Sequence, residues 1–434
     1  MHNQQIVVNA SLKGSVVVVP LMESVVGTCG GKAGALGALL RADLPVPDGF
    51  VVPFDAYLAA VHQLDLGRFA GEPDDVAAAR QAVEALPVPA AVIDALGRAL
   101  DQLGEPPVAV RSSAAKEDTC QASAAGQHDS FLAVRGVGAV ATAVRACWAS
   151  LFSPRAVAYR AASDDQPFGD LLMAVIVQRH VDAEVSGVMF TPADPDEATR
   201  IEASWGLGPS IVEGRVTPDA YRVARDGSVT RTVADKQKRL DRHGTRLVIR
   251  DVPTAVRNRP AIDDATAARL AELGGQIAAA LGGPQDVEWA IADGRTWILQ
   301  ARPVTAVLPP PPPPPPAPPS GAPGVTIAEL AGTPGSHGTV TGIARIVRGF
   351  GDFARVRPGD ILVCPFTDPA WTPLLRIAAG VVTETGGVLS HAAIVAREHG
   401  IPAVLGVPNA TSRLRDDTVV TIDGTTGTVT AADA

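Results

Sequence analysis

A run of prolines divides this sequence into two parts. Residues 309–316 are all proline, and Ala317, Pro318 and Pro319 extend the run to eleven residues. Proline fixes the backbone angle φ and lacks an N–H donor, so the run cannot form a helix or a central strand. A polyproline II conformation is expected instead, which makes the segment a stiff spacer about 34 Å long. We therefore expect independently folded parts before and after it.

Proline-rich segments also serve as ligands for proline-binding domains, but globular sequence on both sides favours a spacer here. The part before the spacer mixes helical and strand-like segments, which indicates an α/β or α+β fold. In the part after it, short strands alternate with short helices, as is typical of a compact β/α domain. The predicted helices are 265–281, 373–379 and 391–399, and the predicted strands are 173–178, 185–190, 296–300, 338–347, 361–364, 380–383 and 418–422.

The composition is that of a folded globular protein. The chain has 434 residues, 46% hydrophobic and 19% charged, which is enough for roughly two to four domains with buried cores. The net charge is −9 and no long basic block occurs, so we expect no binding to nucleic acid. Residues 1–15 lack the features of a secretion signal, and the apolar run 16–19 is too short to span a membrane, so a cytoplasmic protein is expected. The four cysteines form no CxxC pair and indicate neither a zinc site nor a disulfide.

His391 begins one of the predicted helices. Ser390 is a candidate N-cap, and Gly400 with Pro402 marks the end of the helix. The imidazole would then lie at the positive end of a helix dipole, near backbone N–H groups that have no partner within the helix, and such a place suits a phosphoryl dianion. Histidine is also a covalent nucleophile near neutral pH. We therefore predict that His391 is transiently phosphorylated; the plainer alternative is a polar capping residue.

The glycine-rich segment 27–37 contains Lys32 and superficially matches a P-loop. That motif requires glycine where Val26 stands, and serine or threonine where Ala33 follows the lysine, so the match fails at two positions. What remains is a glycine turn that presents a lysine at the start of a helix, an arrangement suited to binding phosphate. Close helix packing by small residues is the alternative.

Two further segments carry candidate ligands. Arg111 follows the strand-like run 108–110, where its guanidinium can bind two phosphate oxygens. Glu288, Gln300 and Arg302 lie on two predicted strands, and Gln300 and Arg302 share a face because they are two positions apart. Carboxylate and amide oxygens suit Mg²⁺, and an arginine beside them suits phosphate. A surface ion pair and an ordinary half-buried hairpin are the alternatives.

Taken together, these motifs resemble a known family. Residues 360–411, with Thr-Asp-Pro-Ala-Trp-Thr-Pro-Leu at 367–374 and Ser-His-Ala-Ala-Ile-Val-Ala-Arg-Glu at 390–398, closely resemble the mobile phosphohistidine domain of phosphoenolpyruvate-utilising enzymes. In that alignment His391 matches the phosphorylated histidine. Residues 26–305 resemble the ATP-grasp nucleotide-binding domain of phosphoenolpyruvate synthase, pyruvate phosphate dikinase and rifampin phosphotransferase.

The resemblance implies a two-subdomain ATP-grasp domain joined by the linker to a swivelling phosphohistidine domain. The implied boundaries are an N-terminal extension at 1–15, the ATP-grasp domain at 16–307, the linker at 308–324 and the phosphohistidine domain at 325–434. ATP and Mg²⁺ are the implied cofactors. The implied roles are phosphate contacts from Lys32 and Arg111, metal ligation by Glu288 and Gln300, stabilisation of the transition state by Arg302, and phosphoryl transfer by His391.

The same resemblance implies a dikinase reaction, in which the β-phosphoryl group of ATP passes to His391 and then to a small-molecule acceptor, with AMP and phosphate as the other products. The relatives carry a large acceptor domain, for which this sequence shows no counterpart. We therefore expect an acceptor bound by a partner chain. One alternative is a self-contained small-molecule kinase that binds its acceptor between the two domains. The other is a non-catalytic nucleotide-binding regulatory or assembly protein. The identity of the acceptor stays open.

Overall fold

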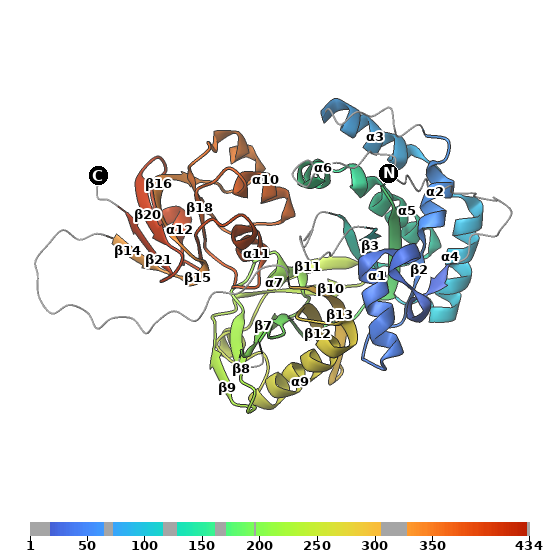
Figure 1. Ribbon diagram of the computed structural model, residues 1–434, viewed down its shortest axis with the longest axis horizontal. Helices are drawn as coiled ribbons and strands as arrows, with labels where there is room; N and C mark the ends of the chain where they lie inside the picture. Colours follow the sequence, from blue (N-terminus) through green and yellow to red (C-terminus); the bar gives the residue numbers. More distant parts are fainter. Residues whose placement is uncertain are drawn as a thin grey trace, which may run out of the picture.

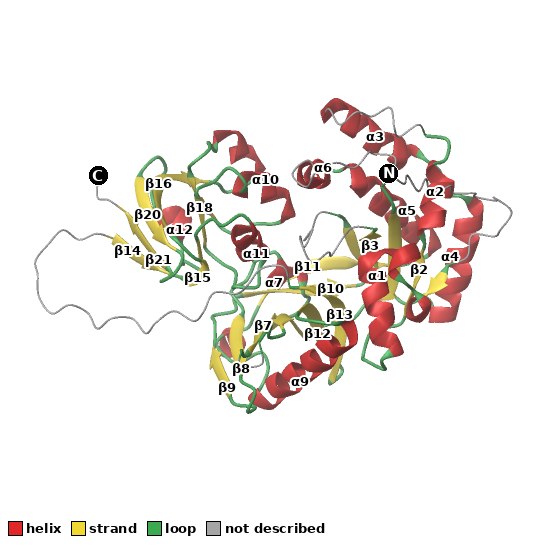
Figure 2. Ribbon diagram, in the orientation of Figure 1, coloured by secondary structure: helices red, strands yellow, loops and turns green. Residues whose placement is uncertain are grey.

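The computed structural model describes residues 18–64, 73–115, 128–160, 171–194, 197–304 and 328–431. The predicted extension at 1–15 and the predicted linker at 308–324 lie outside these ranges. The described residues form an N-terminal part, 18–304, and a C-terminal part, 328–431, which lie against each other (Figure 1). Both parts combine helices with strands, as Figure 2 shows, so the predicted mixed α/β character is confirmed.

The first sheet of the N-terminal part is antiparallel, with strand order β1-β2-β5-β3-β4. Its strands are β1 (Val19–Pro20), β2 (Gly49–Val52), β3 (Val108–Ala114), β4 (Ser130–Val134) and β5 (Met173–Arg179). The accompanying helices are α1 (Val26–Arg41), α2 (Phe54–Val61), α3 (Pro73–Ala85), α4 (Ala90–Leu103), α5 (Val137–Ala149) and α6 (Pro154–Arg160).

Strand β5 belongs to two hydrophobic cores at once. Its residues Met173, Val175 and Val177 pack with helices α2, α4 and α5. The alternate residues Ala174 and Ile176 pack in a second core with α1, α9 and the second sheet. Successive side chains of a strand point to opposite faces, so a strand covered on both sides has a continuous apolar sequence.

The second sheet of the N-terminal part is also antiparallel, with strand order β13-β12-β6-β7-β8-β9. Its strands are β6 (Val185–Phe190), β7 (Thr199–Trp205), β8 (Asp219–Val223), β9 (Val229–Thr232), β12 (Gln285–Ala292) and β13 (Arg295–Pro303). A separate hairpin is formed by β10 (Lys238–His243) and β11 (Arg246–Asp251), and the helices are α7 (Pro209–Val212), α8 (Thr254–Arg257) and α9 (Asp264–Leu281).

Helix α9 covers one face of this second sheet, so the other face is left for the C-terminal part. The Asp263 side chain accepts a hydrogen bond from Thr266 N and caps the start of the helix, and Gly282 ends it in the left-handed conformation. Apolar residues of α9, including Leu270 and Ile277, pack in the core that the helix shares with the sheet.

The C-terminal part is an eight-stranded sheet with order β14-β21-β20-β16-β17-β18-β19-β15, in which β16 to β19 are parallel. Its strands are β14 (Ala328–Ala331), β15 (Thr333–Ser336), β16 (Thr339–Ile346), β17 (Ile361–Cys364), β18 (Gly380–Thr383), β19 (Ala403–Leu405), β20 (Val419–Asp423) and β21 (Thr428–Ala431). Its helices are α10 (Thr372–Leu375), α11 (His391–Glu398) and α12 (Ala410–Arg413). The alternation of strands and helices predicted from the sequence is present.

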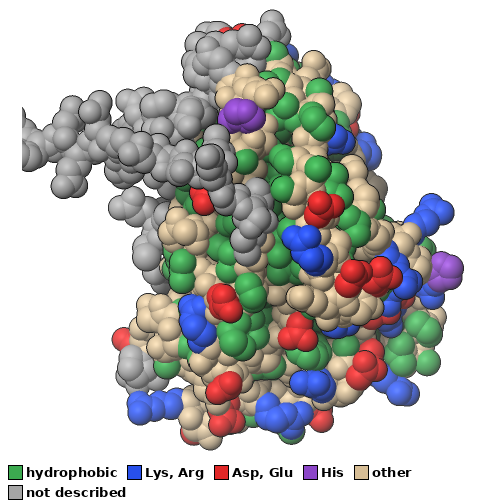
Figure 3. All heavy atoms as spheres, turned by 90° about the vertical axis from the view of Figure 1, so that its right-hand side faces the viewer, with side chains coloured by type: hydrophobic (Ala, Val, Ile, Leu, Met, Phe, Trp, Pro, Cys, Tyr) green, Lys and Arg blue, Asp and Glu red, His purple; other side chains and the backbone are tan. Residues whose placement is uncertain are grey.

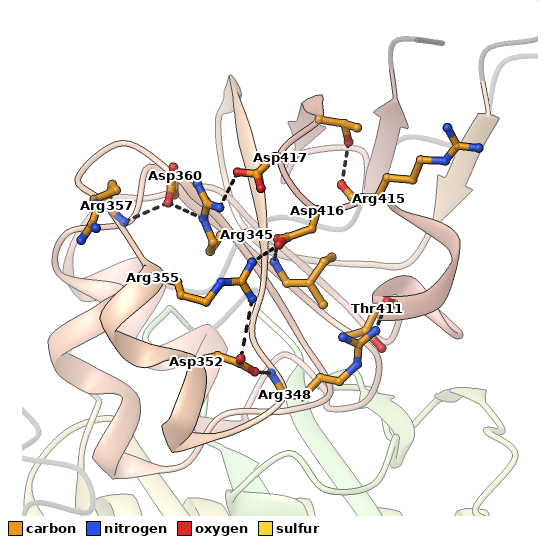
Figure 4. Close-up of polar contacts among 12 residues, drawn as sticks. Arg345, Arg348, Asp352, Arg355, Arg357, Asp360, Thr411, Arg415, Asp416 and Asp417 are labelled. Carbon is orange, nitrogen blue, oxygen red and sulfur yellow. Dashed lines mark hydrogen bonds and ion pairs between the residues drawn. The ribbon is translucent and has the colours of Figure 1, made fainter.

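Arginine–aspartate pairs connect strand β16 and the segments 352–360 and 416–417 of the C-terminal part (Figure 4). Arg345 on β16 donates to Asp360 at 3.0 Å and also pairs with Asp417. Arg355 pairs with Asp416, which in turn accepts from the backbone of β16. These pairs join strand β16 to the segments around it; Arg345 and Asp360 are largely buried, whereas Arg355 and Asp416 are partly exposed and pair with modest strength.

The same network reaches the loop before α11 through Thr411. Arg348 donates to the carbonyl oxygen of Thr411 at 2.8 Å, and the backbone N–H and the hydroxyl of Thr411 donate to Glu384 Oε1 at 2.9 and 2.7 Å. Glu384 directly follows β18, so these hydrogen bonds fix the start of the loop that leads to His391.

The outer face of the N-terminal part, seen in Figure 3, shows basic and acidic side chains interspersed among apolar ones. Within the described ranges, no single helix has the length and apolar character needed to cross a membrane. Helices α3 and α4, bent by 65° at the break between them, reach that threshold only when they are taken together.

Candidate active site

One cleft brings together all six residues that the sequence singled out. It has a volume of about 420 Å³ and lies where the two sheets of the N-terminal part meet helix α11 of the C-terminal part. Its lining includes Lys32, Arg111, Glu288, Gln300, Arg302 and His391. Valine and leucine side chains from β6, α7 and β13 also line the cleft, so it has apolar walls beside this polar group.

Lys32 follows a kink in helix α1. Gly30 has φ = 80°, which interrupts the helical backbone and starts a second helical segment just before the lysine. A Cβ atom at Gly30 would lie 2.5 Å from Ser113 Oγ, and the Ser113 hydroxyl accepts from Ala33 N at 3.1 Å. Glycine therefore allows the turn to pack against β3, two residues beyond Arg111. The predicted glycine turn that presents a lysine at a helix start is present.

Glu288 and Gln300 are direct partners across β12 and β13, and their oxygens converge on one point. The Arg111 Nη2 atom occupies that point, 3.2 Å from Glu288 Oε2 and 2.8 Å from Gln300 Oε1. Arg111 Nη1 donates to Leu299 O at 2.6 Å. Two hard oxygen donors that already surround one positively charged group fit a divalent cation such as Mg²⁺.

Arg302 forms a buried ion pair with a residue that sequence reasoning missed. Its Nε and Nη2 atoms lie 2.8 and 2.7 Å from Asp286 Oδ2, and the two residues are only 7% and 5% exposed. Asp286 precedes Glu288 by two positions on β12, so the two carboxylates share a face of the sheet. This spacing was the signal in the sequence that could have identified Asp286.

His391 is buried, with 3% of its surface exposed, at the start of α11. Its Nδ1 lies 3.0 Å from Thr367 Oγ1, and its Nε2 lies 3.3 Å from Thr372 Oγ1. The Thr372 hydroxyl donates to Pro369 O, so toward Nε2 it can only accept. The hydrogen-bond network therefore places the ring proton on Nε2, and Nδ1 accepts from Thr367.

Burial lowers the pKa of His391 to about 3, and the positive charges of Arg302 and Arg155 act in the same direction. The imidazole is therefore neutral at pH 7. Arg155, on α6, lines the same cleft and pairs with Asp129. Thr367 and Thr372 flank the tryptophan of the 367–374 motif, and no local pattern marks them as neighbours of the histidine.

The N-cap predicted at Ser390 is only partly correct. Ser390 has the extended backbone of an N-cap, but its hydroxyl donates to Gly387 O at 2.8 Å and makes no cap bond to the helix. Residues 391–396 of helix α11 are buried, and Ala392, Val395 and their neighbours face the C-terminal core. Ile394, on another side of the helix, packs on the N-terminal part.

Two family models match the sequence. The model described as pyruvate phosphate dikinase, AMP/ATP-binding domain, matches residues 26–309, and the model described as PEP-utilising enzyme, mobile domain, matches residues 356–427. The chain belongs to the phosphoenolpyruvate synthase and pyruvate phosphate dikinase family. The N-terminal part is its ATP-binding domain, and the C-terminal part is its mobile domain.

Curated relatives agree with this assignment. The chain is 38% identical over 429 residues to a probable phosphoenolpyruvate synthase of Methanothermobacter thermautotrophicus, a match that covers 93% of the chain and 61% of the relative. It is 34% identical to the phosphoenolpyruvate synthase of Pyrococcus furiosus, with coverages of 92% and 56%. It is 35% identical to that of Escherichia coli, with coverages of 93% and 56%. The chain thus spans little more than half the length of these relatives.

Proposed function

We propose that this protein is an ATP-dependent phosphotransferase of the dikinase type, in which His391 carries a phosphoryl group from ATP to an acceptor. The main support is that His391, from the mobile domain, lines the same cleft as the polar residues of the ATP-binding domain. A neutral imidazole in that cleft carries a lone pair that can attack phosphorus once its hydrogen bond from Thr367 is released.

The products AMP and phosphate require two P–O bonds to break. In the first step, a nitrogen of His391 forms a bond to the β-phosphorus while the bridge between the α- and β-phosphates breaks, and AMP leaves. In the second step, water attacks the γ-phosphorus, the bridge between the β- and γ-phosphates breaks, and phosphate leaves. One phosphoryl group then remains on His391 for transfer.

In this proposal, Lys32 and Arg111 bind phosphate oxygens, and Arg302 stabilises the charge that develops as AMP departs. Glu288 and Gln300 would hold Mg²⁺, which when bound neutralises charge on the phosphates. The Arg111 guanidinium lies between these two oxygens, so it must turn toward the phosphates for all of these residues to act together.

The acceptor is a small molecule, and in this proposal a partner chain binds it. Purified protein alone would then release AMP about once per His391 and stop until the partner is added. A self-contained kinase with its acceptor between the two domains would turn over repeatedly with its substrate alone. A non-catalytic regulatory protein would bind ATP and form no acid-labile phosphoprotein.

The decisive experiment is parallel labelling with ATP that carries the label at either the β- or the γ-phosphorus. We expect acid-labile label on the wild-type protein from the β position after phosphate has left, and no label on His391→Ala. Stable label from the γ position alone, or label that persists in His391→Ala, would overturn the dikinase mechanism.

A further inference from the structure

Glu202 is a buried carboxyl group on β7 that neither the fold nor the proposed chemistry explains. It is 3% exposed, although glutamate is rarely buried without a partner. The strand register aligns Gln300, Glu288, Val188 and Glu202 in one row across β13, β12, β6 and β7. Directly paired residues on adjacent strands project from the same face of a sheet, so Glu202 lies on the face that carries the proposed metal ligands, two strands away from Glu288.

The Glu202 carboxyl group meets the loop before His391. Its Oε2 atom accepts from Leu389 N at 3.3 Å, and the nearby backbone of Val388 also favours the charged form of the carboxyl group. A Cβ atom at Gly387 would lie 2.5 Å from Oε2, so only glycine permits this approach. The carboxyl group thus holds the turn that leads into α11 by a backbone N–H that precedes the first residue of the helix.

The surrounding contact between the two domains is mostly apolar. Side chains of β6 and the α7 region pack against Leu389 and Ile394 of the mobile domain; the N-terminal members of this cluster are Val188, Phe190, Ile211 and Val216. Figure 1 shows α11 on the side of the mobile domain that faces α7. Apolar contact is not directional, so hydrogen bonds must fix the position of the loop. Besides Glu202, the Thr385 hydroxyl contributes one such bond, to Gly214 O at 2.6 Å.

The positive charges of two arginines act on Glu202. Arg200 lies on the same strand, and Arg397 extends from α11, where its Nη1 atom donates to Gly335 O at 2.8 Å. Among the described residues, Nε and Nη2 of Arg397 are buried without a hydrogen-bond partner. The negative charge of Asp286 favours the charged form of this arginine. Burial raises the pKa of Glu202 to about 7, and the nearby backbone, Arg397 and Arg200 only partly oppose this effect.

We propose that Glu202 is a positioning residue that docks the 385–390 loop on the ATP-binding domain and holds His391 over the ATP phosphates. The inference rests on the proposed function, in which His391 must reach ATP and then leave. Release of the mobile domain returns Glu202 to water, where an ordinary glutamate is ionised at neutral pH.

The sign of the pH dependence follows from the raised pKa in the docked state. Docking is favoured most below the ordinary pKa of glutamate, weakens by up to about tenfold per pH unit as the pH rises toward 7, and levels off above it. Glu202→Gln is neutral at every pH and retains one oxygen acceptor, so its docking should not change with pH in this range. Glu202→Ala leaves the Leu389 N–H without this acceptor at every pH.

The test uses the full chain and measures the single-turnover rate of AMP formation from pH 5 to pH 9, together with the affinity for ATP. We expect Glu202→Ala to lose about 10- to 100-fold in rate with less than about a twofold change in ATP affinity. Glu202→Gln should lose little rate and most of the pH dependence. Glu184→Gln, an exposed carboxyl group of the same sheet region, is the matched control and should behave like the wild type.

Several results would overturn the proposal: a wild-type rate in Glu202→Ala, a parallel loss of ATP affinity, or an unchanged pH profile in Glu202→Gln. Hydrogen exchange at the amides of residues 387–391 gives a readout that does not need catalysis. If the wild type fails to form AMP, the proposed function fails, but faster exchange in Glu202→Ala would still support docking by Glu202. Unchanged exchange would remove the docking role.

Discussion

Asp219 and Glu202 are buried carboxyl groups on neighbouring strands of the second sheet, but their hydrogen-bond donors come from different places. Asp219 on β8 accepts from Lys236 Nζ at 2.6 Å and from Ala234 N and Ala261 N at 2.8 and 2.7 Å, all within the ATP-binding domain. Glu202 on β7 accepts from the mobile domain. The donors of Asp219 are in place once its own domain folds, whereas those of Glu202 arrive only when the two domains dock.

The comparison predicts that substitutions at the two sites change the stability of the protein to different extents. Lys236→Met leaves Asp219 buried without its counter-charge and should lower the free energy of unfolding by about 3–5 kcal/mol. Glu202→Gln should change it by less than about 1 kcal/mol, because water can hydrate this side chain when the domains separate. Urea unfolding monitored by circular dichroism measures both. Equal losses would mean that Glu202 is an internal structural residue like Asp219.

Arg302 and Asp286 form a third site, which is internally paired like Asp219 but lies in the cleft. Arg302→Met should reduce the single-turnover rate of AMP formation by about 10²- to 10³-fold, more than any change at Glu202, because it removes a charge next to the reacting phosphates. Arg302→Lys keeps the charge but loses the paired donors, so it should recover only part of the rate. A loss below tenfold in the methionine variant would remove the proposed role of Arg302.

Gly387 offers a steric test of the docking contact. The Cβ atom of Gly387→Ala would overlap the Glu202 carboxyl group and should slow phosphorylation of His391 about tenfold. In the double variant with Glu202→Ala the overlap is gone, so the combined loss should be clearly smaller than the product of the two single losses. Gly351→Ala, where a Cβ atom would meet nothing within 4 Å, is the control. Fully multiplicative losses would show that the two residues act independently.

Thr385 provides the smallest expected effect. Thr385→Val removes the hydrogen bond to Gly214 O at the edge of the domain contact and should slow phosphorylation of His391 about twofold to fivefold. The pH dependence should stay that of the wild type, because Glu202 is intact. A variant that loses the pH dependence would shift the docking role from Glu202 to the loop around Thr385.

Much of this structure could be predicted because its signals are local. Strands β17 and β18 have the predicted bounds, and α11 begins at His391 as predicted. Runs of β-branched residues, followed by glycine and proline stops, depend only on neighbours in the sequence. Strands β14, β15, β19 and β21 were not predicted, because they are short and their formation depends on pairing with distant segments.

The candidate site was predictable in its residues but not in its organisation. The residue types that suit phosphate and metal were visible, and the structure brings them into one cleft. The bond from Leu389 N to Glu202 joins residues 187 positions apart, and no local pattern encodes such a contact. The side-chain cap predicted at Ser390 is absent because its hydroxyl donates to Gly387 O instead, a choice that no local pattern indicates.

The alternating contacts of β5 bear on how the protein unfolds. Met173, Val175 and Val177 belong to one core, and Ala174 and Ile176 belong to the core shared with the second sheet. Loss of either core therefore exposes half of a strand that the other core needs. The two sheets of the ATP-binding domain are expected to melt in a single calorimetric transition, while the mobile domain, which has its own core, melts separately. In thermal terms, the two sheets of the ATP-binding domain should behave as one cooperative unit, and the mobile domain should behave as a second.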